Sequence, residues 1–143
     1  MSNADKPNRN LIYLCACFIV DDVVKSAEYY RDVLGFSFDR YWGEPPCFVN
    51  LQREGVEIFL SGNDPKGRTR PNHVASPDFT WDAYIRCHDA DALYAEFKSK
   101  GAQITRDPEV AFYEMKEFEL QDCNGYILCF AHNTMLEPAH ATM

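Results

Sequence analysis

The sequence lacks both a long apolar run and an excess of basic charge. No stretch approaches the roughly 20 consecutive apolar residues that are needed to cross a bilayer, and the opening MSNADKPNRN has no apolar signal core behind its charges. We therefore expect a cytoplasmic protein with no membrane partner. Lys and Arg number 14 against 22 Asp and Glu, a net charge of −8, so the overall field repels polyanions and argues against a nucleic-acid partner.

Paired-cysteine and nucleophile motifs are also missing. The chain has six cysteines but no CxxC pair, and four of the six lie in strand-like apolar runs, where free cysteine behaves as a small hydrophobe. A reducing compartment fits this pattern. No Ser, His and Asp order typical of a triad is visible, and the GNDPKG segment at 62–67 lacks the Lys-Ser/Thr ending of a phosphate-binding loop. These absences argue against nucleophilic and phosphoryl-transfer chemistry.

Apolar residues are plentiful by contrast. In 143 residues, 46% are hydrophobic and 14% aromatic, which suits one compact domain that folds on packing alone. The polar start and the mixed C-terminal segment have no periodicity, so residues 1–9 and 133–143 are predicted to be loosely held tails. The domain is predicted to cover residues 10–132.

A strand, a capped helix and a glycine stop occur twice along the chain. A strand over Leu11–Val20 is followed by Asp21 and Asp22, either of which can cap a helix that ends near Gly35. The pattern returns as a strand over Ala83–Cys87, a capping aspartate and a helix that stops at a glycine. The apolar faces of the two helices comprise Val23, Ala27, Tyr30 and Leu34 in the first, and Ala90, Leu93, Tyr94 and Phe97 in the second, which Asp89 precedes and Gly101 follows.

Three strands are predicted after each helix. They cover Phe36–Tyr41, Phe48–Gln52 and Val56–Ser61 in the first half, and Gln103–Arg106, Tyr113–Gln121 and Tyr126–Ala131 in the second. Tight turns that end at Gly55 and Gly125 join the last two strands of each set. The chain is therefore predicted to be an α+β protein of two βαβββ modules, at about 10–61 and 81–132, joined by a Pro- and Gly-rich linker at 62–80.

The duplicated pattern, with FIVDDVVKSAEYYRDVLGF opening the first module and FELQDCNGYILCF closing the second, resembles the vicinal oxygen chelate superfamily. This superfamily includes glyoxalase I, the bleomycin resistance proteins and the extradiol dioxygenases. The resemblance implies curved sheets around a shared cavity. It leaves open whether that cavity closes within one chain or across a dimer with swapped modules.

Metal-using members similar to this chain hold their ion with His, Glu or Gln on the first and last strands of each module. The matching positions are Cys15, Phe59, Asp82 and Cys129. Phenylalanine cannot ligate a metal and no histidine is present, so the resemblance implies no metal and no other cofactor here. The remaining metal alternative is a zinc ion held by Cys15, Cys129 and Asp82.

Strand alternation, counted from those four positions, predicts which side chains face the helices and which line the cavity. The helix-facing set is uniformly apolar: Ala16, Phe18, Val20, Ile58, Leu60, Ala83, Ile85, Phe118, Leu120, Leu128 and Phe130. The cavity-facing set is mixed: Cys15, Cys17, Ile19, Phe48, Asn50, Glu57, Phe59, Asp82, Tyr84, Arg86, Glu117, Glu119, Ile127 and Cys129, with Trp42 and Trp81 at its rim. Four carboxylates against a single arginine, among aromatic side chains, favour a flat cationic or aromatic ligand.

In character the chain is most similar to metal-free bleomycin resistance proteins, which implies reversible sequestration of a small molecule, antibiotic resistance and a homodimer. Arg86 would then pair with a ligand carboxylate or with an inward glutamate. One alternative is a lyase, isomerase or dioxygenase that uses a non-standard metal site or a carboxylate base, Glu117 or Glu119, whose pKa burial has raised. Another is a cavity filled by its own side chains, with both tryptophans as packing residues.

Overall fold

Two modules of the same connectivity make up the computed structural model, which describes residues 10–62, 71–78 and 81–136. The first contains β1 (Ala16–Ile19), α1 (Val23–Asp32), β2 (Tyr41–Trp42), β3 (Phe48–Arg53) and β4 (Val56–Ser61). A short helix, α2 (Asn72–Ala75), precedes the second, which contains β5 (Ala83–Arg86), α3 (Ala90–Ser99), β6 (Gln103–Val110), β7 (Met115–Gln121) and β8 (Ile127–Asn133). None of the helices in the described segments has the length and apolar character that a membrane crossing requires.

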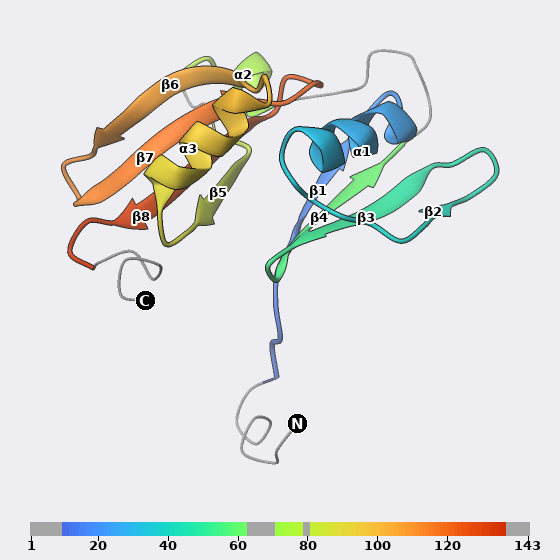
Figure 1. Cartoon of the computed structure of the whole chain (residues 1–143). Coiled ribbons are helices and arrows are strands. Elements are labelled where there is room, and N and C mark those ends of the chain that lie inside the picture. Colours follow the sequence, from blue (N-terminus) through green and yellow to red (C-terminus); the bar gives the residue numbers. More distant parts are fainter. Residues whose placement is uncertain (1–9, 63–70, 79–80, 137–143) are drawn as a thin grey trace.

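Each module forms one four-stranded mixed sheet. The strand orders are β1-β4-β3-β2 and β5-β8-β7-β6, with the first strand parallel to the last strand of its module and the other neighbours antiparallel. One long helix accompanies each sheet (Figure 1). The predicted α+β class with two βαβββ modules is confirmed.

An aspartate caps each long helix as predicted, and of the two candidates at the first helix it is Asp22 that does so. The Asp22 carboxylate accepts a hydrogen bond from the Lys25 amide at 3.0 Å, and the Asp89 carboxylate accepts one from the Ala92 amide at 3.1 Å. Each bond satisfies an amide that the first helical turn leaves unpaired. Gly35, just past α1, has a φ of 75°, a left-handed conformation that glycine adopts without steric cost.

One hydrophobic core serves both modules. The helix-facing side chains predicted by alternation lie in it, either buried or packed against the buried cluster. The modules are also joined by polar contacts: the Tyr30 hydroxyl on α1 donates to Asp122 at 2.5 Å, and Arg53 forms two hydrogen bonds with Glu96 on α3 at 2.7 and 2.9 Å. The two sheets are therefore held in a fixed relation by packing and by buried or half-buried polar contacts.

Several element boundaries differ from those predicted. The first strand begins at Ala16 rather than at Leu11, because its pairing with β4 starts only at Ala16 opposite Ile58. The segment after α1 forms a single bridge, Ser37 with Gln52, and pairs as a strand only at β2. The second module has longer strands at β6 and β8 than predicted.

The predicted tails and linker are covered only in part. Residues 1–9 and 137–143 of the tails, and residues 63–70 and 79–80 of the linker, lie outside the described residues. Within the linker, the structure adds the helix α2, which the sequence did not predict.

Candidate functional site

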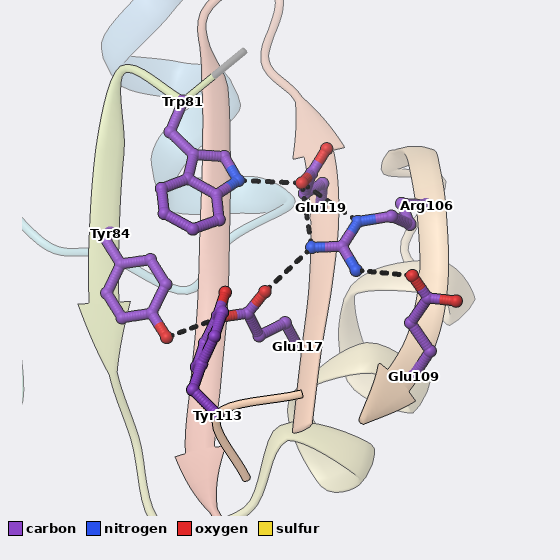
Figure 2. Close-up of polar contacts among 7 residues, drawn as sticks. All are labelled: Trp81, Tyr84, Arg106, Glu109, Tyr113, Glu117 and Glu119. Carbon is purple, nitrogen blue, oxygen red and sulfur yellow. Dashed lines mark hydrogen bonds and ion pairs between the residues drawn. The ribbon is translucent and has the colours of Figure 1, made fainter. Parts of the chain in front are cut away.

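A polar cluster covers the face of the second sheet that points away from α3 (Figure 2). At its centre the Arg106 guanidinium on β6 contacts two glutamates of β7. Its Nη2 lies 3.0 Å from Glu117 Oε1 and 2.9 Å from Glu119 Oε2, and its Nε donates to Glu119 Oε2 at 3.0 Å. Its Nη1 donates to the exposed Glu109 at 3.0 Å. One arginine thus neutralises part of the charge of three carboxylates.

Glu117 is the most buried member of this cluster, with 1% of its surface exposed. Its Oε2 accepts hydrogen bonds from the hydroxyls of Tyr84 and Tyr113, both at 2.6 Å. Burial acts to raise the pKa of Glu117, but the hydrogen bonds from Tyr113, Tyr84 and Arg106 outweigh burial and hold the pKa below its ordinary value. The expected raised pKa is therefore wrong for Glu117, and its carboxylate is a weak base that already accepts three hydrogen bonds.

Glu119 links the cluster to an aromatic pair. The Trp81 indole Nε1 donates to Glu119 Oε2 at 2.7 Å, and the Trp81 ring lies 4.7 Å from the Tyr84 ring, centroid to centroid, at a tilt of 44°. Tyr84 is exposed, whereas Glu119 is buried. This part of the face presents aromatic surface whose polar atoms are already hydrogen-bonded.

Cys129 lies on β8 opposite Glu119 and beside Tyr84 on β5. Its side chain is fully buried. Burial, together with the negative charges of Glu117 and Glu119, raises the pKa of the Cys129 thiol to about 12. The raised pKa favours the neutral thiol, which makes Cys129 a poor nucleophile.

The corresponding face of the first sheet has a different chemistry. The Phe48 and Phe59 rings lie 5.2 Å apart, and beside them Asn50 Nδ2 donates to Glu57 Oε1 at 3.0 Å. Glu57 forms no ion pair with any residue in the described parts of the chain. The side-chain acceptor of Asn50, Oδ1, is buried and has no hydrogen-bond partner among the described residues. Aromatic surface, a carboxylate without a cation and an unused acceptor thus lie together.

Three other residues that were predicted to line the cavity or its rim, Asp82, Arg86 and Trp42, each have different neighbours. The Asp82 carboxylate accepts hydrogen bonds from the backbone amides of Asn72 at 2.7 Å and Ile127 at 2.8 Å. It therefore connects the start of α2 to the start of β8. Arg86 forms no ion pair with a described residue and borders a cavity between the modules. The Arg40 guanidinium lies 3.7 Å above the Trp42 ring, in a cation–π contact.

The residues at the four positions that the resemblance assigned to metal ligands are poor ligands as the structure places them. Phe59 has no donor atom, both oxygens of Asp82 already accept backbone hydrogen bonds, and the Cys129 thiol is protonated at neutral pH. Burial and the nearby Glu57 charge also raise the pKa of the Cys15 thiol. Within the described segments, no group of three or more His, Cys, Asp and Glu side chains is arranged to hold an ion.

The model of the Glyoxalase/Bleomycin resistance protein/Dioxygenase superfamily matches residues 13–130. The chain belongs to this superfamily. No match was found among curated proteins. Members share a fold but differ in chemistry, so membership alone does not specify an activity.

Solved structures with the same fold include a resistance determinant, an antibiotic binding protein and a glyoxalase-related enzyme. The bleomycin resistance determinant encoded on the transposon Tn5 is 21% identical, with a TM-score of 0.66, covering 86% of this chain and 98% of that one. TnmS3, an antibiotic binding protein from Streptomyces sp. CB03234, is 17% identical, with a TM-score of 0.63 and coverage of 87% and 99%. A glyoxalase-related enzyme from Clostridium phytofermentans is 16% identical, with a TM-score of 0.68 and coverage of 90% and 99%.

Sequence reasoning missed Arg106 and Tyr113 as members of the polar cluster. Arg106 was predicted to be the last residue of a strand, without an assigned face. The ladder between β6 and β7 shifts register on both sides of it, so simple alternation does not carry through that point. Arg106, and not Arg86, is the arginine that pairs with the inward glutamates.

Proposed function

We propose that this member of the superfamily binds and sequesters a small cationic or aromatic molecule without a metal ion, and that it works as a homodimer. The proposal depends on one observation above the others: Glu57, on the open face of the first sheet, is a half-buried carboxylate with no paired cation among the described residues, next to the Phe48 and Phe59 rings. A ligand cation would complete that arrangement.

The open faces of the two sheets differ in the ligand contacts that they can provide. On the second sheet Arg106 already pairs with Glu117 and Glu119, so those carboxylates are less available to a ligand cation than the sequence suggested. That face offers the exposed Tyr84 ring, next to Trp81, as stacking surface instead. We therefore assign charge recognition to Glu57 and apolar contact to the aromatic side chains of both faces.

Two further observations support sequestration over catalysis. Glu117, one of the two predicted candidate bases, has a lowered pKa and already accepts hydrogen bonds at both oxygens, which suits a structural role. The bleomycin resistance determinant and the antibiotic binding protein share this fold, and their names describe resistance and binding. The donor set at the four family metal positions supports binding without an ion.

The test is direct ligand titration with bleomycin and with a cationic acridine dye, followed by calorimetry or tryptophan fluorescence. Glu57→Gln keeps the size and the hydrogen bond with Asn50 but removes the charge, and we expect it to weaken binding about ten-fold or more. Glu54→Gln, at an exposed site on the same hairpin, is the matched control and should bind as the unmodified protein does. Equal affinity of Glu57→Gln and the unmodified protein for every bound cation would refute the assignment.

Metal independence has its own measurement. Protein purified without chelators is analysed by mass spectrometry for bound metals, and titrated before and after dialysis against a chelator. We expect no stoichiometric ion and unchanged ligand affinity. A tightly held divalent ion whose removal abolishes binding would overturn this part of the proposal.

A further inference from the structure

A cavity of about 1080 Å³ lies between the two modules. The first module contributes Phe36 and the turn between β3 and β4, and the second contributes the end of β5, α3 and the end of β8. Among the described residues, neither Glu57 nor Arg106 lines it, so it is separate from the two open sheet faces. Its volume is large enough for a small organic molecule.

The walls of this cavity are mainly apolar. Ile85 and Arg86 are consecutive residues of β5, the edge strand of the second sheet, and both line it. Because consecutive strand residues point to opposite faces, the cavity extends around the free edge of β5. An aromatic or other apolar group suits these walls. The large apolar residues of the lining include Phe36, Val56, Ile85, Leu93, Phe97 and Phe130.

His132, on β8, supplies a buried hydrogen-bond donor to the lining. The residue is 8% exposed, and its Nδ1 accepts a hydrogen bond from the Ala90 amide at 2.8 Å. A neutral imidazole that accepts at Nδ1 carries its proton on Nε2. Nε2 has no hydrogen-bond partner among the described residues and is not one of their fully enclosed polar atoms. This N–H is therefore open to a ligand.

Arg86 supplies a positive charge to the same part of the lining. In the ladder between β5 and β8 it lies opposite Ala131, the residue before His132. It forms no ion pair with any described residue. Its guanidinium can therefore offer a bidentate contact to a carboxylate.

The other charged side chains of the lining already have partners. Arg53 contacts Glu96 at 2.7 Å and Glu54 at 3.2 Å, which neutralises much of their charge. The Asp89 carboxylate caps α3 by accepting a hydrogen bond from a first-turn amide at 3.1 Å. Arg86 is thus the charged group of the lining that is left for a ligand, and it favours an anion.

We propose that this cavity is a second ligand site, and that it binds an organic anion with an aromatic body, such as an aromatic carboxylate. The Arg86 guanidinium pairs with the carboxylate, and His132 Nε2 donates a hydrogen bond to it. The aromatic body lies against the apolar walls between the β3–β4 turn and α3. This ligand has the opposite charge to the one proposed for Glu57, and the inference does not depend on that proposal.

The first experiment compares two aromatic probes by isothermal titration calorimetry with the unmodified protein. The anion is 2-naphthoate, and 2-naphthamide has nearly the same shape without the charge. We expect saturable binding of one 2-naphthoate per chain, and at least ten-fold weaker binding of 2-naphthamide. A titration without saturable 2-naphthoate binding, or equal affinities for the two probes, would overturn the inference.

Arg86→Met tests the charged contact. The substitution keeps an apolar stem at an exposed position that has no ion pair to lose, so the variant should fold. We expect it to weaken 2-naphthoate binding at least ten-fold. Arg31→Met is the matched control, because it removes the same charge from an exposed position of α1 outside the cavity lining. Equal affinities of these two variants would overturn the assignment of Arg86.

His132→Asn tests the hydrogen bond from Nε2. The asparagine Oδ1 can accept from the Ala90 amide in place of Nδ1, but no atom replaces the Nε2–H donor. We expect a loss of about three-fold or more in 2-naphthoate affinity, with little change for 2-naphthamide. Thermal melts verify that the variant is folded. Unchanged 2-naphthoate affinity in the folded variant would overturn the role of His132.

A variant on the apolar wall keeps the test independent of His132. Ala92→Glu places a carboxylate in the lining at an exposed position of α3 that tolerates a helix-forming residue. It should weaken 2-naphthoate binding at least ten-fold. Ala95→Glu, exposed on the same helix but outside the lining, should leave it unchanged. Equal affinities of the two variants would place the probe outside this cavity.

Glu57→Gln separates this inference from the proposed function. Glu57 is outside the cavity lining, so its substitution should leave 2-naphthoate affinity unchanged while it weakens cation binding. A loss of 2-naphthoate affinity in Glu57→Gln, together with no effect of Arg86→Met, would place the probe on the first sheet. That result would overturn the second site and leave the proposed function standing.

Discussion

Replacing Arg106 by methionine is the sharpest test of how the second sheet is stabilised. The substitution keeps most of the apolar stem but removes the guanidinium that contacts Glu117 and Glu119. It leaves two carboxylates on the same face of β7 without their cation, one of them 1% exposed. The folded state is expected to lose stability at neutral pH for that reason.

The size of the loss follows from the contacts that remain. Removing one partner of a buried ion pair costs about 3–5 kcal/mol. Glu117 keeps two tyrosine hydroxyl donors and Glu119 keeps the Trp81 indole, and Arg106 is itself partly exposed. We therefore expect a decrease of about 2–3 kcal/mol in the free energy of unfolding at pH 7.

The pH dependence has a definite sign. The folded-state pKa of Glu117 is lowered, so its ion pair stabilises the protein at neutral pH, and this contribution is lost as the pH falls through the folded pKa. The cost of Arg106→Met should therefore shrink at acidic pH. Urea unfolding at pH 7 and at successively lower pH measures it, and a cycle with Glu117→Gln should show a coupling of about 1 kcal/mol or more. Additive effects at pH 7, or a cost independent of pH, would refute this account of the cluster.

Two further predictions concern the module interface and the buried thiol. Arg53→Ala removes the paired hydrogen bonds to Glu96 and should lower the free energy of unfolding by about 1–2 kcal/mol in urea titrations. The control Arg31→Ala, at an exposed ion pair, should cause no measurable change. Equal effects of the two substitutions would contradict a structural role for the contact between the modules. In the native protein, iodoacetamide should modify the exposed Cys47 but not Cys129 until the chain is unfolded, as read by peptide mass spectrometry; rapid native labelling of Cys129 would show that its burial or its raised pKa is wrong.

Local chemistry made much of the fold predictable. Capping by Asp22 and Asp89 depends on residues within one turn of the helix, and strand alternation depends on neighbours two residues away. Both signals were present in the sequence, and both led to the observed structure. The helix-facing side chains followed from the same alternation.

The features that sequence reasoning missed depend on tertiary partners. Arg106 reaches Glu117 across a register shift, which no count along a single strand can place. The apolar run at residues 11–14 indicates apolar surroundings but does not specify whether they belong to the same chain, so a strand was predicted where the structure has an exposed arm. From the sequence, the Asp82 carboxylate cannot be distinguished from one that contacts a ligand. Only the structure shows that it accepts hydrogen bonds from two backbone amides.

The turn between β7 and β8 has a consequence for how the protein unfolds. Asp122 at its start accepts the Tyr30 hydroxyl from the first module, and Tyr126 at its end stacks on Phe18, with ring centroids 4.3 Å apart. We therefore expect that neither module folds alone, because separating them would remove a hydrogen-bond donor from the buried Asp122 carboxylate and expose the aromatic stack. Although the sequence repeat suggests two separable units, the protein should unfold in a single cooperative transition.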